Sequence, residues 1–284
     1  MKEIAASLLP LHDNESYRYL LLDPLRQVSP DSPLHLRELE AALGQEALTP
    51  VLRLDLAHSP SHCPVLVQLA APGEPLPQAQ FNASMTRVGL EAAHERRYLC
   101  GWLASPHSPD KIATLLVTRS RQLGLALGDH KVLPFYEPLR LELLHHTYGL
   151  AETLWPITHW WYPSASGKLH HLQGSAEGHE WAMDSGMVRI QSDMAQVQAL
   201  LFAWQRAASP SPLPDDAARR AAEIWVWASD RVNHPHDRFT LALIALHSED
   251  DYRTSPALVQ LVQQVKRHPA HRIQPVLDAL SQEK

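Results

Sequence analysis

Histidine is the residue type in this sequence with the widest range of chemistry, and the chain contains 18 of them. Imidazole titrates near neutral pH, so it can move protons, and its neutral form binds metal ions. The histidines that lie close together in the sequence, or close to other polar groups, are His145, His146, His159, His170, His171, His179, His234 and His236. A zinc protease of the HExxH type needs two histidines one helical turn apart with a glutamate between them, and the sequence lacks this pattern.

The adjacent histidine pairs are spaced so that their rings point apart. His145 and His146 are neighbours on an expected helix, where successive side chains differ by about 100°. His170 and His171 are neighbours on an expected strand, where they face opposite sides. We therefore expect these four histidines to be ordinary surface or core residues whose nitrogens are hydrogen-bonded.

His234 and His236 flank Pro235 and could present two imidazoles together, with Asp237 next in the chain. The spacing marks no third ligand, so the sequence predicts no metal site and no cofactor. A histidine-rich, metal-dependent hydrolase remains the enzymatic alternative.

Nucleophile motifs are the second kind of chemistry to consider. Residues 108–111 (SPDK) match the SxxK pattern of serine acyl-enzymes, but the companion KTG motif is absent from the sequence. Ser108 before Pro109 is instead typical of a helix N-terminus. Cys63 follows His62, but Pro64 then leads into an apolar run, which favours a packed, unreactive thiol. The chain is not predicted to be an enzyme.

Aromatic residues give a more informative signal, because the chain has eight tryptophans and only four phenylalanines. Trp160, Trp161 and Tyr162 follow one another on an expected strand, so large aromatic rings lie on both of its faces. Either both faces are covered, or one face is exposed and contacts another protein. Trp160, Trp161 and Tyr162 are therefore our candidate partner-binding residues.

The composition is that of an ordinary folded protein, with 45% hydrophobic and 20% charged residues. The net charge of −6 gives no support to nucleic-acid binding. Two distant cysteines make a disulfide framework improbable. The first residues do not have the pattern of a signal peptide, and the apolar runs are too short to span a bilayer. We expect a cytoplasmic protein that does not bind membranes.

The spacing of apolar residues and of proline predicts the elements. Strands are expected at residues 17–22, 65–69, 98–103 and 131–136, and helices at 33–43, 86–96, from 109 to about 124, and 139–148. Between residues 155 and 190, four short pieces separated by glycine predict an antiparallel meander: ITHWWY, KLHHLQG, HEWAM and MVRI. A helix over residues 194–206 is expected to close this region.

Residues 207–216 (AASPSPLPDD) contain three prolines and two serines, which is typical of a linker. Four helices are expected beyond it: one to about residue 229, one over about 237–247, one that begins at Pro256, and one over about 270–280. The predicted fold class is therefore mixed α/β (α+β). An α/β lobe with a small β meander covers residues 1–206, and a smaller all-helical lobe covers residues 217–284.

Several segments together resemble a known family. They are YLLLDPL from residue 19, CPVLVQL from residue 63, GWLASPHSPDKIATLLVTRSRQL from residue 101, VLPFYEPLRLELL from residue 132, and WPITHW from residue 155. In this order they resemble the adaptor or chaperone family of bacterial type VI secretion systems, over about residues 17–173. Members of that family are encoded beside toxic effectors and load them onto the VgrG spike.

The most specific part of the resemblance is formed by Phe135, Tyr136, Glu137, Pro138 and Arg140. The family shows two aromatic residues followed by Asp-Pro-Arg. Here Glu137 replaces the aspartate, and the arginine comes one residue later. We expect a structural role for this motif, because the proline can begin a helix and the glutamate can lie at its positive end.

The resemblance implies a non-enzymatic adaptor without cofactor or metal. Its partners would be the N-terminal segment of a secreted effector and the VgrG spike, with no nucleic acid and no membrane. Besides the hydrolase, the other alternative is an immunity-like protein that binds a toxin in order to block it.

Overall fold

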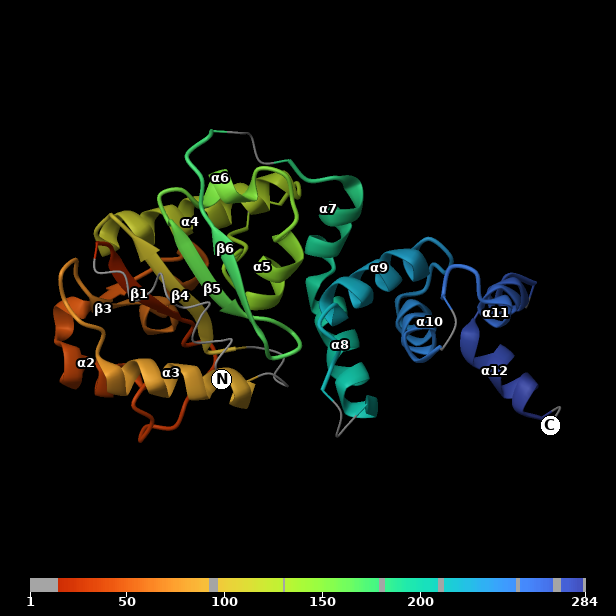
Figure 1. Cartoon of the computed structure of the whole chain (residues 1–284). Helices are drawn as coiled ribbons and strands as arrows, with labels where there is room; N and C mark the ends of the chain where they lie inside the picture. The colour runs from red at the N-terminus through yellow and green to blue at the C-terminus, as the bar shows by residue number, and fades with distance from the viewer. Residues whose placement is uncertain are drawn as a thin grey trace. The chain divides into compact units, whose positions relative to one another are not determined.

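The structure, a computed structural model, describes residues 15–91, 97–129, 131–178, 182–208, 212–248, 251–267 and 272–282 (Figure 1). The chain divides into two compact units, with the boundary between Val188 and Arg189. The first unit is a sheet covered by helices, and the second consists of helices in its described part. The predicted mixed α/β fold class is therefore confirmed.

The sheet of the first unit has six strands in the described residues, in the spatial order β2-β3-β1-β4-β5-β6. Every neighbouring pair is antiparallel. The strands are β1 (Tyr17–Leu22), β2 (Leu48–Pro50), β3 (Val65–Ala70), β4 (Leu99–Ser105), β5 (His159–Pro163) and β6 (Leu169–Gln173). The expected strands at residues 17–22, 65–69 and 98–103 correspond to β1, β3 and β4.

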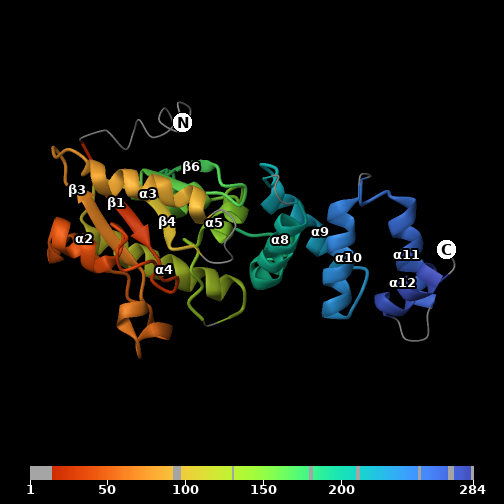
Figure 2. The same cartoon turned by 90° about the horizontal axis from the view of Figure 1, so that it is seen from below.

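The central strands are largely apolar, as expected for a sheet that is covered on both faces. Leu21 of β1 belongs to one core cluster, and Leu20 belongs to the other. Helices α4 (Pro109–Ala126), α5 (Pro138–Leu144) and α6 (Leu150–Leu154) contribute to the first cluster. Helices α2 (Leu36–Leu43) and α3 (Gln78–Glu91) contribute to the second. Figure 2 shows α3 and α4 on opposite sides of β1.

Two predicted strands are wrong. Residues 131–136 form no strand, because Pro134 cannot donate a ladder hydrogen bond and the chain turns there, with Glu137 N bonded to Pro134 O at 3.0 Å. The MVRI piece lies inside helix α7 (Ser185–Ser192). That helix begins at Asp184, whose carboxylate accepts a hydrogen bond from Met187 N at 2.7 Å.

The meander is therefore smaller than predicted. Its first two pieces form the hairpin β5–β6. Residues 179–181 of the third piece, which include the candidate His179, lie outside the described residues. Residues 92–96 of the helix expected at 86–96 also lie outside them. The helix expected at 139–148 ends at Leu144, and α6 follows after Gly149, which has a φ of 75°.

The second unit contains helices α8 (Met194–Ala208), α9 (Ala217–Ser229), α10 (Pro235–His247), α11 (Pro256–Arg267) and α12 (Ile273–Gln282). All five correspond to expected helices. Helix α8 was expected to belong to the first lobe, but it packs against α9 and α10. The boundary therefore lies at residues 188/189 rather than after residue 206. Of the expected linker, residues 209–211 lie outside the described part of the chain.

No helix in the described ranges is both long enough and apolar enough to cross a membrane.

Candidate functional site

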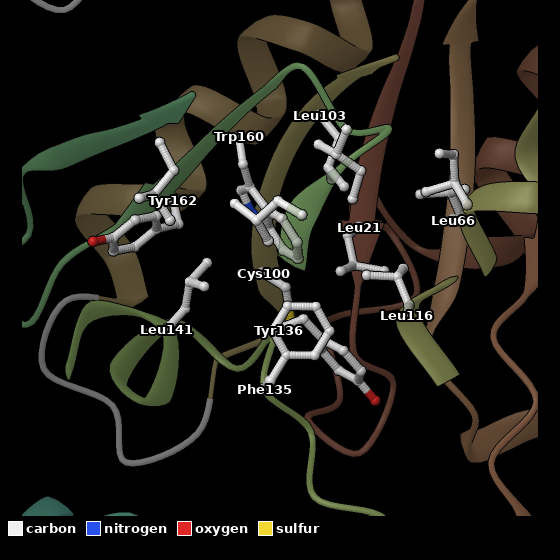
Figure 3. Close-up of a cluster of buried hydrophobic side chains, with 14 of the residues drawn as sticks. Leu21, Leu66, Cys100, Leu103, Leu116, Phe135, Tyr136, Leu141, Trp160 and Tyr162 are labelled. Carbon is white, nitrogen blue, oxygen red and sulfur yellow. The ribbon is translucent and has the colours of Figure 1, made fainter. Parts of the chain in front are cut away.

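The motif at residues 135–140 lies in the core of the first unit. Phe135 and Tyr136 are fully buried, and the Phe135 ring meets Trp160 edge-to-face at 5.7 Å between centroids (Figure 3). The Tyr136 hydroxyl accepts a hydrogen bond from Arg53 Nη1 at 3.4 Å. Burial raises the pKa of Tyr136 far above its ordinary value. The two aromatic residues of the motif are therefore packing residues.

The second half of the motif begins helix α5. Glu137 is the N-cap, and its carboxylate accepts hydrogen bonds from Leu139 N at 3.3 Å and Arg140 N at 3.0 Å. Pro138 is the first helical residue, where its missing N–H costs no hydrogen bond. Arg140 is buried on the same helix. These contacts give the motif the structural role that the sequence suggested.

The structure contradicts the proposed aromatic surface. Trp160, Trp161 and Tyr162 all have no exposed area, so the prediction that this segment presents a ring to a partner is wrong. Trp160 and Tyr162 belong to the cluster under α4, α5 and α6, and Trp161 belongs to the opposite cluster. Strand β5 has a covered face on each side, which is why rings on both faces are tolerated.

Histidines surround this buried strand instead. On one face, the rings of His159 and His171 stack against Trp161, with centroids 5.4 and 4.8 Å from it. His159 Nδ1 lies 3.0 Å from His171 Nε2, which is hydrogen-bond distance. The strand pairing makes this possible, because Trp161 and His171 are directly opposite one another in β5 and β6.

On the other face, the Tyr162 hydroxyl lies 2.7 Å from His145 Nδ1 and 3.4 Å from His170 Nδ1. The His146 ring is 4.7 Å from the His145 ring. We call His145, His146, His159, His170 and His171 the histidine cluster. The sequence did not predict this convergence, since its members come from the residues just after α5 and from the two strands of a hairpin.

Charge is unfavourable inside the histidine cluster. Burial, together with His146, His170 and His171, lowers the pKa of His145 to about 4. Burial and the neighbouring His159 also lower the pKa of His171. Both rings are therefore neutral at pH 7, and each can donate one hydrogen bond and accept another.

A buried carboxyl lies next to the cluster on α5. Glu142 accepts a hydrogen bond from Ala165 N at 2.7 Å, and burial raises its pKa to about 7. Arg97 donates to the carbonyl oxygens of Pro163 and Ser164. Together these groups hold the end of β5 and the turn after it. Burial also raises the pKa of Tyr162, so its hydroxyl is a poor source of phenolate.

The other candidate residues are not brought together. Ser108 stands at the N-terminus of α4, as expected, and Lys111 is paired with His107 at 3.4 Å. Cys63 is buried. His234 and His236 are exposed at the start of α10, while Asp237 is paired with Arg272 at 2.8 Å. In the described ranges, no group of three or more histidine, cysteine or acidic residues could hold a metal ion.

The outer edge of the sheet is the feature that the sequence did not reveal. Among the described strands, β6 has a neighbour, β5, on one side only. Gly174 N bonds to Thr158 O at 2.9 Å and Ser164 N to Lys168 O at 2.7 Å, so alternate residues of β6 point their main chain toward β5. The N–H and C=O groups of Leu169, His171 and Gln173 point away from β5.

No protein-family model, curated protein or solved structure matches this chain.

The second unit has a concavity of its own. A groove of about 510 Å³ between α10 and α11 is lined mainly by apolar residues: Leu243, Ile244, His247, Ser248, Ser255, Ala257 and Leu258. Its lining includes no lysine, arginine, aspartate or glutamate. The groove is therefore the alternative binding surface against which the edge of the sheet is tested.

Proposed function

We propose that this chain is a non-catalytic cytoplasmic adaptor that binds a type VI secretion effector and helps to load it onto the VgrG spike. One observation supports it most directly: among the described residues, β6 is the edge strand of the sheet, has exposed residues, and pairs with β5, whose Trp160, Trp161 and Tyr162 are fully buried. Such an edge is suited to contact with another polypeptide. The resemblance over residues 17–173 supplies the kind of partner.

The polar groups around β5 and β6 support binding better than they support catalysis. The Tyr162 hydroxyl and the Glu142 carboxyl are engaged within the fold, and burial opposes the charged form of each. Neutral imidazoles at the surface can instead donate and accept hydrogen bonds from a partner.

The proposal is tested by co-expression. The chain is produced with an effector encoded beside a VgrG gene in the same genome, and one protein is tagged and purified. We expect the effector to co-purify in a stoichiometric complex, and its secretion to fail when the gene for this chain is deleted. An effector from an unrelated cluster is the matched control. Normal secretion of the cognate effector from the deletion strain would contradict the proposal.

A further inference from the structure

We propose that the partner protein adds an extended segment to β6 as a further strand of the sheet, with acidic side chains placed beside the histidine cluster. This inference rests on the proposed function, and it specifies where and by what chemistry the partner binds. It can fail while the adaptor function stands.

The main chain of β6 is the first part of the argument. Leu169, His171 and Gln173 point their N–H and C=O groups to the open side, and none of these groups has a hydrogen-bond partner among the residues that the structure describes. Each such residue offers one donor and one acceptor at the spacing of a strand. An extended segment that pairs with them gains a ladder of main-chain hydrogen bonds without requiring a particular sequence.

The opposite edge of the sheet does not offer this. Strand β2 has three residues, and Val51 N bonds to Pro64 O at 2.7 Å, so the main chain of Leu48 and Pro50 points outward. The Leu48 N–H already bonds to Gln45 O. Proline has no N–H to donate, and short edges with proline resist pairing with another chain. Strand β6 has five residues and contains no proline.

The β6 edge is also held in place. Leu172 is buried in the core cluster that contains Trp160, and His171 stacks on the fully buried Trp161. A strand whose position is fixed before binding loses little further conformational freedom when a partner pairs with it.

Side chains at this edge favour acidic groups on the partner. On one face of the hairpin the titratable groups are His159 and His171, next to Trp161. On the other face they are His145, His146, His170 and Tyr162, with the Glu142 carboxyl bonded to Ala165 N. Lys168 lies before the strand and Glu177 after it. Imidazoles and one lysine therefore predominate over exposed carboxylates here, which favours a partner carboxylate.

Proton uptake should accompany such binding. Mutual repulsion and burial keep His145 and His171 neutral at pH 7. A carboxylate beside His171 favours the protonated ring, so an acidic segment should bind more tightly as the pH falls from 7.5 to 5.5.

The main-chain part is tested with Gln173→Pro in the full-length chain, with Gln173→Ala as the matched control. Proline removes the outward N–H while leaving the hydrogen bonds between β5 and β6, whereas alanine removes only the exposed side chain. The probe is the effector that co-purifies with the unmodified chain. We expect Gln173→Pro to weaken effector binding at least tenfold and Gln173→Ala less than twofold, with similar melting temperatures for both variants.

Hydrogen–deuterium exchange on the unmodified chain gives a second readout that needs no proline variant. Binding of the effector should slow exchange at the amides of Leu169, His171 and Gln173. Protection in the α10–α11 groove without protection of β6 would overturn the inference. So would a complex that Gln173→Pro leaves unchanged, or a homodimer that Gln173→Pro dissociates. If the unmodified chain binds no effector at all, the proposed function fails as well.

The charge part is tested with His171→Gln and His171→Glu. We expect His171→Glu to weaken effector binding at least fivefold at pH 6, and His171→Gln to flatten the dependence of affinity on pH. Equal affinities for the three proteins at pH 5.5 and pH 7.5 would overturn the preference for an acidic segment.

Discussion

Trp160 and Trp161 are adjacent in the chain but fill different cores. Trp160 packs against Phe135, and Trp161 lies on the other side of the sheet under two stacked histidines. Neither indole reaches the surface. Each therefore contributes to the stability of the first unit and not to a contact surface.

Replacing either tryptophan by alanine should lower the free energy of unfolding by about 3–5 kcal/mol, because each change leaves a large cavity in a packed core. The matched control is Trp155→Ala, since Trp155 is 42% exposed and its loss should cost about 1 kcal/mol or less. Urea unfolding measures the three values. A Trp161→Ala protein as stable as the Trp155→Ala protein would contradict the two-core arrangement.

Glu142 makes stability depend on pH. Its pKa is raised from 4.5 to about 7, so the folded protein holds this proton more tightly than the unfolded chain does. The stability that it contributes is fully present below pH 4.5 and is lost as the pH rises through 7. The shift corresponds to a loss of up to about 3 kcal/mol.

Glu142→Gln should remove this loss while leaving an oxygen to accept the hydrogen bond from Ala165 N. The free energy of unfolding of the variant, relative to that of the unmodified protein, should therefore be larger at pH 8 than at pH 5. Urea unfolding at the two pH values measures it. Glu177→Gln, at an exposed position, is the control and should show no such gain. A constant difference between Glu142→Gln and the unmodified protein would contradict the raised pKa.

At the scale of elements, the start of α5 shows why the motif at residues 135–140 has its form. The chain leaves the core at Tyr136, turns, and enters the helix through Glu137 and Pro138. The helix then contributes Leu141 and Leu144 to the core. Its C-terminal end places His145 beside Tyr162. The cap therefore fixes the helix that positions one side of the histidine cluster.

Glu137→Ala should destabilise the protein by about 1 kcal/mol, because the Leu139 and Arg140 amides lose their acceptor. Glu137→Asp should keep most of that stability, since aspartate is a strong N-cap. Thermal melts of both variants provide the measurement. Equal destabilisation by alanine and by aspartate would show that the carboxylate does not act as a cap.

At the scale of the whole molecule, histidine titration controls the net charge. Half-protonation of 18 imidazoles would change a net charge of −6 to about +3, and the sequence pI is near 6.3. His145 does not contribute in this range, because burial and its histidine neighbours lower its pKa to about 4. The change in charge therefore comes from histidines other than His145.

We expect light scattering by the purified protein to rise between pH 6 and pH 7, where the net charge passes through zero and association is favoured. His145→Gln should leave the position of this maximum unchanged, because the His145 ring is not charged there. A flat profile across this range would mean that most of the remaining histidines are also held neutral.

The sequence by itself determined the features that depend on local spacing. Short β-prone and apolar runs located β1, β3 and β4, and proline followed by helical periodicity located α4 and α11. The role of Glu137 and Pro138 was also readable, because a cap and the residues that it bonds are separated by only two or three positions. These interactions are local, so no knowledge of the rest of the fold was needed.

Only the tertiary structure decided what lies against each element. A strand with rings on both faces is compatible with a covered face or an exposed one, and the choice depends on helices distant in the sequence. The same holds for the histidine cluster, whose members meet through the pairing of β5 with β6 and the packing of α5. The open edge at β6 follows from the strand order, which is set by contacts between residues far apart in the chain.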